Sequence, residues 1–134
     1  MKNIYADFMA FEINTHQKLL RTKWVQSISS TEYRKGMSFV LDTIRTQNLE
    51  LWLYDASRSS GPEISDQIWM AEVFTPLINK TKIQRVAAVV SQDLIQQTVI
   101  DKIHTRSQAY KRADVSFETF YDLASAEEWL LAGN

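Results

Sequence analysis

The sequence predicts an α/β domain: a mixed, mostly parallel sheet with an N-terminal antiparallel hairpin, and helices that cover the sheet. Two observations lead to this prediction. The chain opens with two extended segments joined by turn residues, and apolar stretches of strand length then alternate with amphipathic stretches of helix length. Strands that alternate with helices need crossover connections, which make the strands parallel. The expected element order is β-β-α-β-α-β-α-β-α within one domain, residues 1–134.

The hairpin and the first helix have recognisable boundaries. Residues 11–13 and 19–25 have extended patterns, and residues 14–17, Asn-Thr-His-Gln, have turn chemistry between them. Ser29 and Glu32 then have the spacing of a capping box, which predicts the start of a helix. The expected inward stripe of this helix is Tyr33, Met37, Val40, Leu41 and Ile44.

The middle of the chain predicts the centre of the sheet and one irregular helix. Asn48 closes the first helix, and residues 49–54 form a compact apolar run suited to a central strand. Pro76 lies inside or just beyond the second helix, so we expect a kink or a break near Thr75. The residues expected to face inward on this helix are Ile68, Trp69, Val73 and Leu77. Residues 83–90 give the best buried-strand signal in the chain.

The last third of the chain predicts a helix, an edge strand and a closing helix. Ser91 is the expected cap of the third helix, and residues 115–120 alternate as an edge strand should. Ser125 and Glu128 form a second capping box, which predicts the start of the final helix. The residues expected to face inward on these two helices are Leu94, Ile95, Val99, Ile103, Trp129 and Leu130.

Composition and charge exclude several classes of protein. The chain is 45% hydrophobic and 23% charged, and its formal net charge of -1 argues against a dedicated nucleic-acid binder. It has no cysteine, which excludes disulfides, thiolate metal sites and a cysteine nucleophile. The first ten residues lack the pattern of a signal peptide, and no apolar stretch approaches the roughly 18 residues of a membrane span. We therefore expect a cytoplasmic protein without a membrane span.

No catalytic, metal or cofactor motif is recognisable. The two histidines, His16 and His104, are read as a turn residue and part of a helix face, and neither lies in a metal-ligand cluster. The chain has no Gly-x-Ser-x-Gly elbow, no Gly-x-Gly-x-x-Gly loop and no phosphate-binding loop of the Walker type. The sequence therefore predicts a protein that is not an enzyme and has no cofactor.

The sequence resembles the SpoIIAA-like family, relatives of the STAS domains that act as anti-sigma-factor antagonists. The resemblance rests on residues 31–34 (Thr-Glu-Tyr-Arg), 51–55 (Leu-Trp-Leu-Tyr-Asp) and 85–90 (Arg-Val-Ala-Ala-Val-Val). The closing residues 126–130, Ala-Glu-Glu-Trp-Leu, match as well. These positions mostly build the fold, so the resemblance implies a scaffold more than an activity.

The resemblance implies two kinds of function. STAS antagonists carry a phosphorylatable Ser or Thr after the central strand, and Ser59 and Ser60 are the matching candidates for phosphorylation here. The pattern departs from that motif at Pro62 and Glu63, where the antagonists continue into an apolar helix. The architecture is also similar to CRAL-TRIO lipid-carrier domains, which implies a small hydrophobic ligand.

The loop after the central strand is the predicted binding loop for a ligand or partner. It lies at the carboxyl end of a predicted parallel strand, where open α/β sheets place their ligand sites. Its polar residues are Asp55, Ser57, Arg58, Ser59, Ser60 and Asp66. The alternative interpretation is a polar surface loop whose side chains satisfy backbone groups and cap the next helix.

Two surfaces remain as candidates for binding. Trp69, Met70 and Phe74 are candidates for an apolar pocket beneath the second helix. Phe8, Met9 and Phe11 are candidates for an exposed edge surface that would form a homodimer. The leading functional prediction is a non-enzymatic regulatory module that works through contact with a protein partner or with itself. The alternative is a carrier of a small apolar ligand, and an enzyme comes third.

Overall fold

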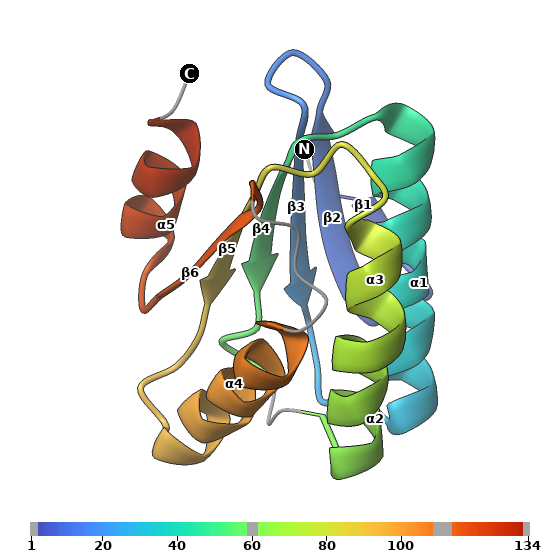
Figure 1. The fold of residues 1–134 in the computed structure, drawn as a ribbon, viewed down its shortest axis with the longest axis vertical. Coiled ribbons are helices and arrows are strands. Elements are labelled where there is room, and N and C mark those ends of the chain that lie inside the picture. The colour runs from blue at the N-terminus through green and yellow to red at the C-terminus, as the bar shows by residue number, and fades with distance from the viewer. Residues whose placement is uncertain (1–2, 59–61, 109–113, 133–134) are drawn as a thin grey trace.

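The computed structural model describes residues 3–58, 62–108 and 114–132, which form one sheet and the helices around it (Figure 1). The strands are β1 (Asn3–Tyr5), β2 (Met9–Asn14), β3 (Leu19–Trp24), β4 (Leu51–Asp55), β5 (Arg85–Val89) and β6 (Ser116–Phe120). The helices are α1 (Ser30–Gln47), α2 (Ile64–Trp69), the π-helical turn η1 (Met70–Phe74), α3 (Thr75–Ile78), α4 (Leu94–Ser107) and α5 (Leu123–Leu131).

The six strands lie in the sheet in the order of the sequence, and they confirm the predicted fold class. The pairs β1–β2 and β2–β3 are antiparallel, whereas β3–β4, β4–β5 and β5–β6 are parallel. The predicted hairpin is β2–β3, and the predicted edge strand is β6. Each parallel connection runs through a helix, as the alternation of strands and helices requires.

The first strand, β1, is an addition to the predicted order. A tight turn joins it to β2, with the Phe8 N–H bonded to the Tyr5 carbonyl at 3.2 Å. The two central residues, Ala6 and Asp7, both have positive φ, which is the geometry of a type I′ turn. Such turns favour Asn or Gly, so the sequence carries no turn signal here, and three residues are too few to show a strand period.

The sheet separates two apolar cores. The larger core lies between the sheet and the helices α1, η1, α3 and α4, and the smaller core lies between the opposite face and α5. On β4, Trp52 and Tyr54 belong to the larger core and Leu51 and Leu53 to the smaller one, which is the alternation expected of a strand covered on both faces. All five residues of β4 are buried.

Both predicted ends of α1 are confirmed. The Ser29 hydroxyl accepts the Glu32 N–H at 3.2 Å, and the Glu32 carboxylate accepts the Ser29 N–H at 2.9 Å, which completes the capping box. Asn48 ends the helix in the left-handed conformation with φ 53°. These local signals could be recognised in the sequence because each involves residues only three or four positions apart.

The packing of α1 on the sheet depends on Gly36. A Cβ atom at this position would lie 2.5 Å from Cη2 and 2.7 Å from Cζ3 of Trp24, and 3.2 Å from Cε of Met9. Trp24 is fully buried, and its indole N–H donates to the Tyr54 hydroxyl at 2.8 Å, so the ring has no free space to move into. Gly36 therefore lets the helix approach the strand.

Replacing Gly36 with alanine is expected to lower the free energy of unfolding by about 2 kcal/mol, because overpacking against Trp24 outweighs the higher helix propensity of alanine. Urea unfolding followed by circular dichroism measures the change. The control is Ser38→Ala on the exposed side of the same helix, for which we expect a change within about 0.5 kcal/mol. A Gly36→Ala protein as stable as the wild type would contradict this account of the packing.

The predicted second helix corresponds to the consecutive elements α2, η1 and α3. The face that it buries differs from the predicted one. Its buried residues are Asp66, Met70, Ala71, Phe74 and Ile78. The predicted inward residues Val73 and Leu77 are 45% and 43% exposed, and Ile68 and Trp69 are only half-buried. Two neighbouring stripes of this helix are apolar, so periodicity alone could not choose between them.

Of the two alternatives predicted near Thr75, a kink or a break, the break is absent, because the backbone stays helical through Pro76. A π-helical turn precedes the proline: the Thr75 N–H bonds to the Met70 carbonyl, five residues back. Proline cannot donate a backbone hydrogen bond, and its ring crowds the preceding turn. The wider π-helical turn lies where that crowding occurs, so the helix changes its type where the sequence predicted a kink or a break.

Two further predictions are corrected by the tertiary contacts. Phe8 and Met9 are 3% and 0% exposed and belong to the larger core, so they form no exposed edge surface, and Phe11 is half-buried against that core. The final helix begins at Leu123, because the Asp122 carboxylate accepts the Ser125 N–H at 2.8 Å. Asp122 is therefore the N-cap in place of the predicted Ser125.

Candidate functional site

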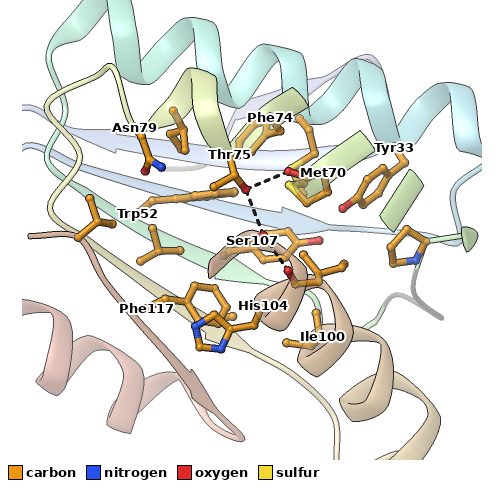
Figure 2. A pocket seen from close by; sticks show the side chains of 18 residues that line it. Tyr33, Trp52, Met70, Phe74, Thr75, Asn79, Ile100, His104, Ser107 and Phe117 are labelled. Carbon is orange, nitrogen blue, oxygen red and sulfur yellow. Dashed lines mark hydrogen bonds between the residues drawn. The ribbon is translucent and has the colours of Figure 1, made fainter. Parts of the chain in front are cut away.

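An apolar pocket of about 130 Å³ lies in the larger core, between the sheet and the helices α1, η1, α3 and α4 (Figure 2). Residues from three neighbouring strands form one wall, and residues from the helices form the other. The described residues that line it are Tyr33, Met37, Trp52, Tyr54, Pro62, Met70, Phe74, Thr75, Ile78, Asn79, Val86, Ala88, Ile100, Ile103, His104, Ser107, Val115 and Phe117.

The lining is mostly apolar and carries no Lys, Arg, Asp or Glu among the described residues. Aromatic rings make up much of the wall: the ring centroids of Trp52 and Phe74 are 5.9 Å apart, and those of His104 and Phe117 are 4.9 Å apart. A site of this composition binds apolar molecules through burial of their surface, because it offers no charged group to an ionic ligand.

Hydroxyl groups connect the two helical walls of the pocket. Thr75 Oγ1 donates to the Met70 carbonyl at 2.9 Å and lies 3.3 Å from Ser107 Oγ on α4. Ser107 Oγ in turn donates to the Ile103 carbonyl at 2.7 Å, and all three contacts are drawn in Figure 2. The Met70 carbonyl is within reach because the π-helical turn places it one residue further back than an α-helix would.

Two tyrosines line the pocket, Tyr33 from α1 and Tyr54 from β4. Burial raises the pKa of the Tyr33 phenol well above its usual range, and the neighbouring Tyr54 and Asp66 raise it further. Burial also raises the pKa of Tyr54, although the hydrogen bond from Trp24 lowers it in part. Both phenols are therefore neutral at physiological pH and remain able to donate a hydrogen bond.

The residues of the predicted binding loop have different surroundings in the structure. Asp55 is 6% exposed, and its Oδ1 accepts the Ser57 N–H at 3.0 Å and the Ser57 hydroxyl at 2.6 Å. Arg58 is exposed, and Ser59 and Ser60 lie outside the described residues. The contacts of Asp55 and Ser57 are those of the alternative interpretation, in which polar side chains satisfy the backbone of a turn.

Asp66 belongs to α2 and pairs with α1. It is 1% exposed, and its Oδ1 accepts Arg34 Nε at 2.7 Å and the Ser30 hydroxyl at 2.8 Å. Its Oδ2 is buried without a hydrogen-bond partner among the described residues. Arg34 also lies over the ring of Trp69, 5.5 Å from its centroid. These contacts join two helices, so Asp66 is not part of the predicted loop site.

Of the three predicted pocket residues, Met70 and Phe74 line the pocket and Trp69 does not. Trp69 packs beside it, with its ring centroid 6.1 Å from that of Phe74. The larger part of the lining, including Tyr33, Trp52 and His104, was not predicted from the sequence. Alternation along the strands would have found Trp52 with Tyr54 and Val86 with Ala88, because residues two apart on a strand share one face.

A second hollow, of about 340 Å³, lies on the opposite face of the sheet, between β2–β4 and the start of α5. Arg21 in this hollow pairs with two carboxylates: its Nε lies 3.0 Å from Glu127 Oε1, and its Nη1 lies 3.3 Å from Glu12 Oε1. Lys23 and Asp55 also line the hollow. We favour the apolar pocket as the functional site, because its lining is the more uniform in chemistry.

The described residues show no cluster of three or more histidine or acidic side chains that would hold a metal ion. Over the same part of the chain, no helix is both long enough and apolar enough to cross a membrane.

Comparison with known proteins identifies the fold. No family pattern and no curated protein matches the sequence. The structure is similar to the crystal structure of an uncharacterised protein of the DUF3478 family, with a SpoIIAA-like fold, from Shewanella loihica PV-4. The TM-score is 0.59, the identity is 16%, and the match covers 96% of this chain and 99% of the other. The chain therefore has a SpoIIAA-like fold, as its sequence resemblance implied.

Proposed function

We propose that this protein is a binding module for a small apolar molecule, which occupies the pocket between the sheet and the helices α1, η1, α3 and α4. The observation that carries the proposal is a pocket of about 130 Å³ lined by aromatic and aliphatic side chains without a Lys, Arg, Asp or Glu among the described residues. Binding of this kind needs no catalytic step and no cofactor. The regulatory protein-interaction module and its serine switch stay predictions.

The size of the pocket supports a ligand with a single ring. An engineered apolar cavity of roughly 150 Å³ in another protein binds benzene. A ring that loses roughly 200 Å² of apolar surface on binding gains about 5 kcal/mol. This free energy corresponds to a dissociation constant of about 0.2 mM, so weak but specific binding is expected.

Toluene is a suitable first ligand. At 2 mM, about ten times the expected dissociation constant, it should stabilise the protein by about 1.4 kcal/mol, because it binds only the folded state. For a chain of this size we expect the midpoint of thermal unfolding to rise by roughly 3–5 °C. Amide chemical shifts in an NMR titration should change mainly around η1, α4 and the centre of β5.

A matched pair of variants tests the location. Ser107→Leu places a larger side chain in the pocket and should abolish the toluene effect, whereas Ser38→Leu on the exposed side of α1 should keep it. The loss of the Ser107 hydroxyl is tolerable because Thr75 Oγ1 still donates to the Met70 carbonyl. Equal toluene stabilisation in both variants, or a wild type without stabilisation or shift changes, would overturn the proposed function.

A further inference from the structure

We propose that the ligand of this pocket is a neutral molecule with one ring and a hydrogen-bond acceptor, and that the hydroxyls of Tyr33 and Tyr54 donate to that acceptor. This inference rests on the proposed function and deepens it, because it names the chemical class of the ligand. The inference rests on which polar side chains of the pocket have hydrogen-bond partners within the protein and which hydroxyls can still donate a hydrogen bond.

The Tyr54 hydroxyl can donate a hydrogen bond to a ligand. Its oxygen accepts the Trp24 indole N–H at 2.8 Å, while its own hydrogen has no acceptor among the described residues. A hydroxyl that already accepts one hydrogen bond is polarised and becomes a better donor. Tyr54 is only 9% exposed and lines the pocket, so its side chain is largely shielded from bulk solvent.

The Tyr33 hydroxyl provides the second donor. The side chain is 3% exposed, and its hydroxyl makes no hydrogen bond to another described residue. Figure 2 shows the Tyr33 hydroxyl on the side of the ring that faces the interior of the pocket. The nearby carboxylate of Asp66 is not its acceptor, because the free oxygen, Oδ2, has no hydrogen-bond partner among the described residues. The Tyr33 oxygen is not among the fully buried atoms that lack a hydrogen-bond partner, so a molecule in the pocket can reach it. Two hydroxyls that can donate at one pocket point to a ligand with an acceptor atom.

Most other polar side chains of the pocket are engaged within the protein. Thr75 and Ser107 donate to carbonyl groups of their own helices. Asn79 and His104 also have interaction partners, although one ring nitrogen of His104, Nε2, makes no hydrogen bond to a described residue. A ligand acceptor would therefore be oriented toward the two tyrosines and its apolar part toward Trp52 and the helices.

The side chains that line the pocket also disfavour an ionised ligand. The described lining has no Lys or Arg to pair with a carboxylate and no Asp or Glu to pair with an ammonium group. Burying an unpaired charge costs far more than one neutral hydrogen bond returns. A ketone, aldehyde or ether on a single ring has the required chemistry.

Acetophenone and α-methylstyrene form a matched pair of test ligands, because the carbonyl of the first is replaced by a carbon–carbon double bond of nearly the same shape in the second. We expect the wild type to bind acetophenone about tenfold more tightly in NMR titrations at pH 7.5, as two additional hydrogen bonds would require. Benzoate, the ionised counterpart, should bind at least tenfold more weakly than acetophenone.

Tyr33→Phe should reduce the preference for acetophenone over α-methylstyrene to about threefold, because it removes one of the two donors. The variant should fold normally, because the Tyr33 hydroxyl holds no partner within the described residues. Tyr121→Phe, at a position that is 55% exposed and outside the pocket, should keep the full preference.

The possible outcomes separate this inference from the proposed function. Equal affinities of the wild type for acetophenone and α-methylstyrene would overturn the role of the tyrosines and leave the apolar pocket intact as a binding site. Benzoate binding as tightly as acetophenone would overturn the neutral class. If neither neutral ligand bound, the proposed function itself would be overturned.

Discussion

The protein is expected to lose about 3 kcal/mol of stability between pH 10 and pH 11.5, beyond any effect of its other groups, because it buries Tyr33 and Tyr54 in their neutral form. Burial raises the pKa of both phenols above the ordinary value of 10.0. Well below pH 10, at about pH 9 and lower, both phenols are protonated in the folded and unfolded states, so they contribute no pH dependence. Above pH 10 the unfolded chain releases two protons that the folded protein retains.

The sign follows from this difference in bound protons. The folded state holds more protons than the unfolded state above pH 10, so the free energy of unfolding decreases as the pH rises, by about 1.4 kcal/mol per pH unit for each tyrosine. Urea unfolding at several pH values between 8.5 and 11.5, followed by circular dichroism, measures the slope.

Tyr33→Phe should remove about half of the slope that the two tyrosines cause. Tyr121→Phe removes one phenol from an exposed position and controls for the composition of the chain. If the Tyr33→Phe protein and the wild type lost stability equally over this range, the assignment of the pH dependence to the buried phenols would be wrong.

Leu130→Ala is expected to lower the free energy of unfolding by about 3 kcal/mol, within the usual range for a buried leucine. Leu130 is fully buried and belongs, with Leu19, Leu51 and Leu53, to the core between α5 and the sheet. This core is small, so the cavity left by the substitution has few side chains around it that can relax. Urea unfolding measures the loss.

Leu123→Ala is the matched control, because Leu123 lies on the same helix and is 46% exposed. We expect it to cost less than about 1 kcal/mol. Toluene stabilisation should survive in both variants, since the apolar pocket lies on the other face of the sheet. A Leu130→Ala protein as stable as Leu123→Ala would show that α5 is not packed as described.

The pocket was predictable only in part from the sequence. Met70 and Phe74 were identified because they lie on an amphipathic segment, but that segment has two adjacent apolar stripes. Trp69 lies on one stripe and Phe74 on the other, and the structure buries the stripe that also contains Asp66. The choice depends on contacts with other elements: Phe74 packs on Trp52 of β4, and Asp66 pairs with Arg34 of α1.

By itself, the sequence determined the features that depend on neighbouring residues. The capping box of Ser29 and Glu32, the left-handed end of α1 at Asn48 and the alternation of strands with helices could be predicted, because each follows from local hydrogen bonding or periodicity. The parallel sheet then follows from connectivity alone.

Only the tertiary structure decided the features that depend on competition between nearly equal local choices. Asp122 and Ser125 are both suitable N-cap residues, and the observed start of α5 uses Asp122. The π-helical turn before Pro76 and the buried face of the second helix depend on packing against β4 and α1. Tyr33 and Tyr54 are 21 positions apart in the sequence. They meet at one pocket because α1 packs across the sheet through Gly36, a contact between distant residues that no local pattern records.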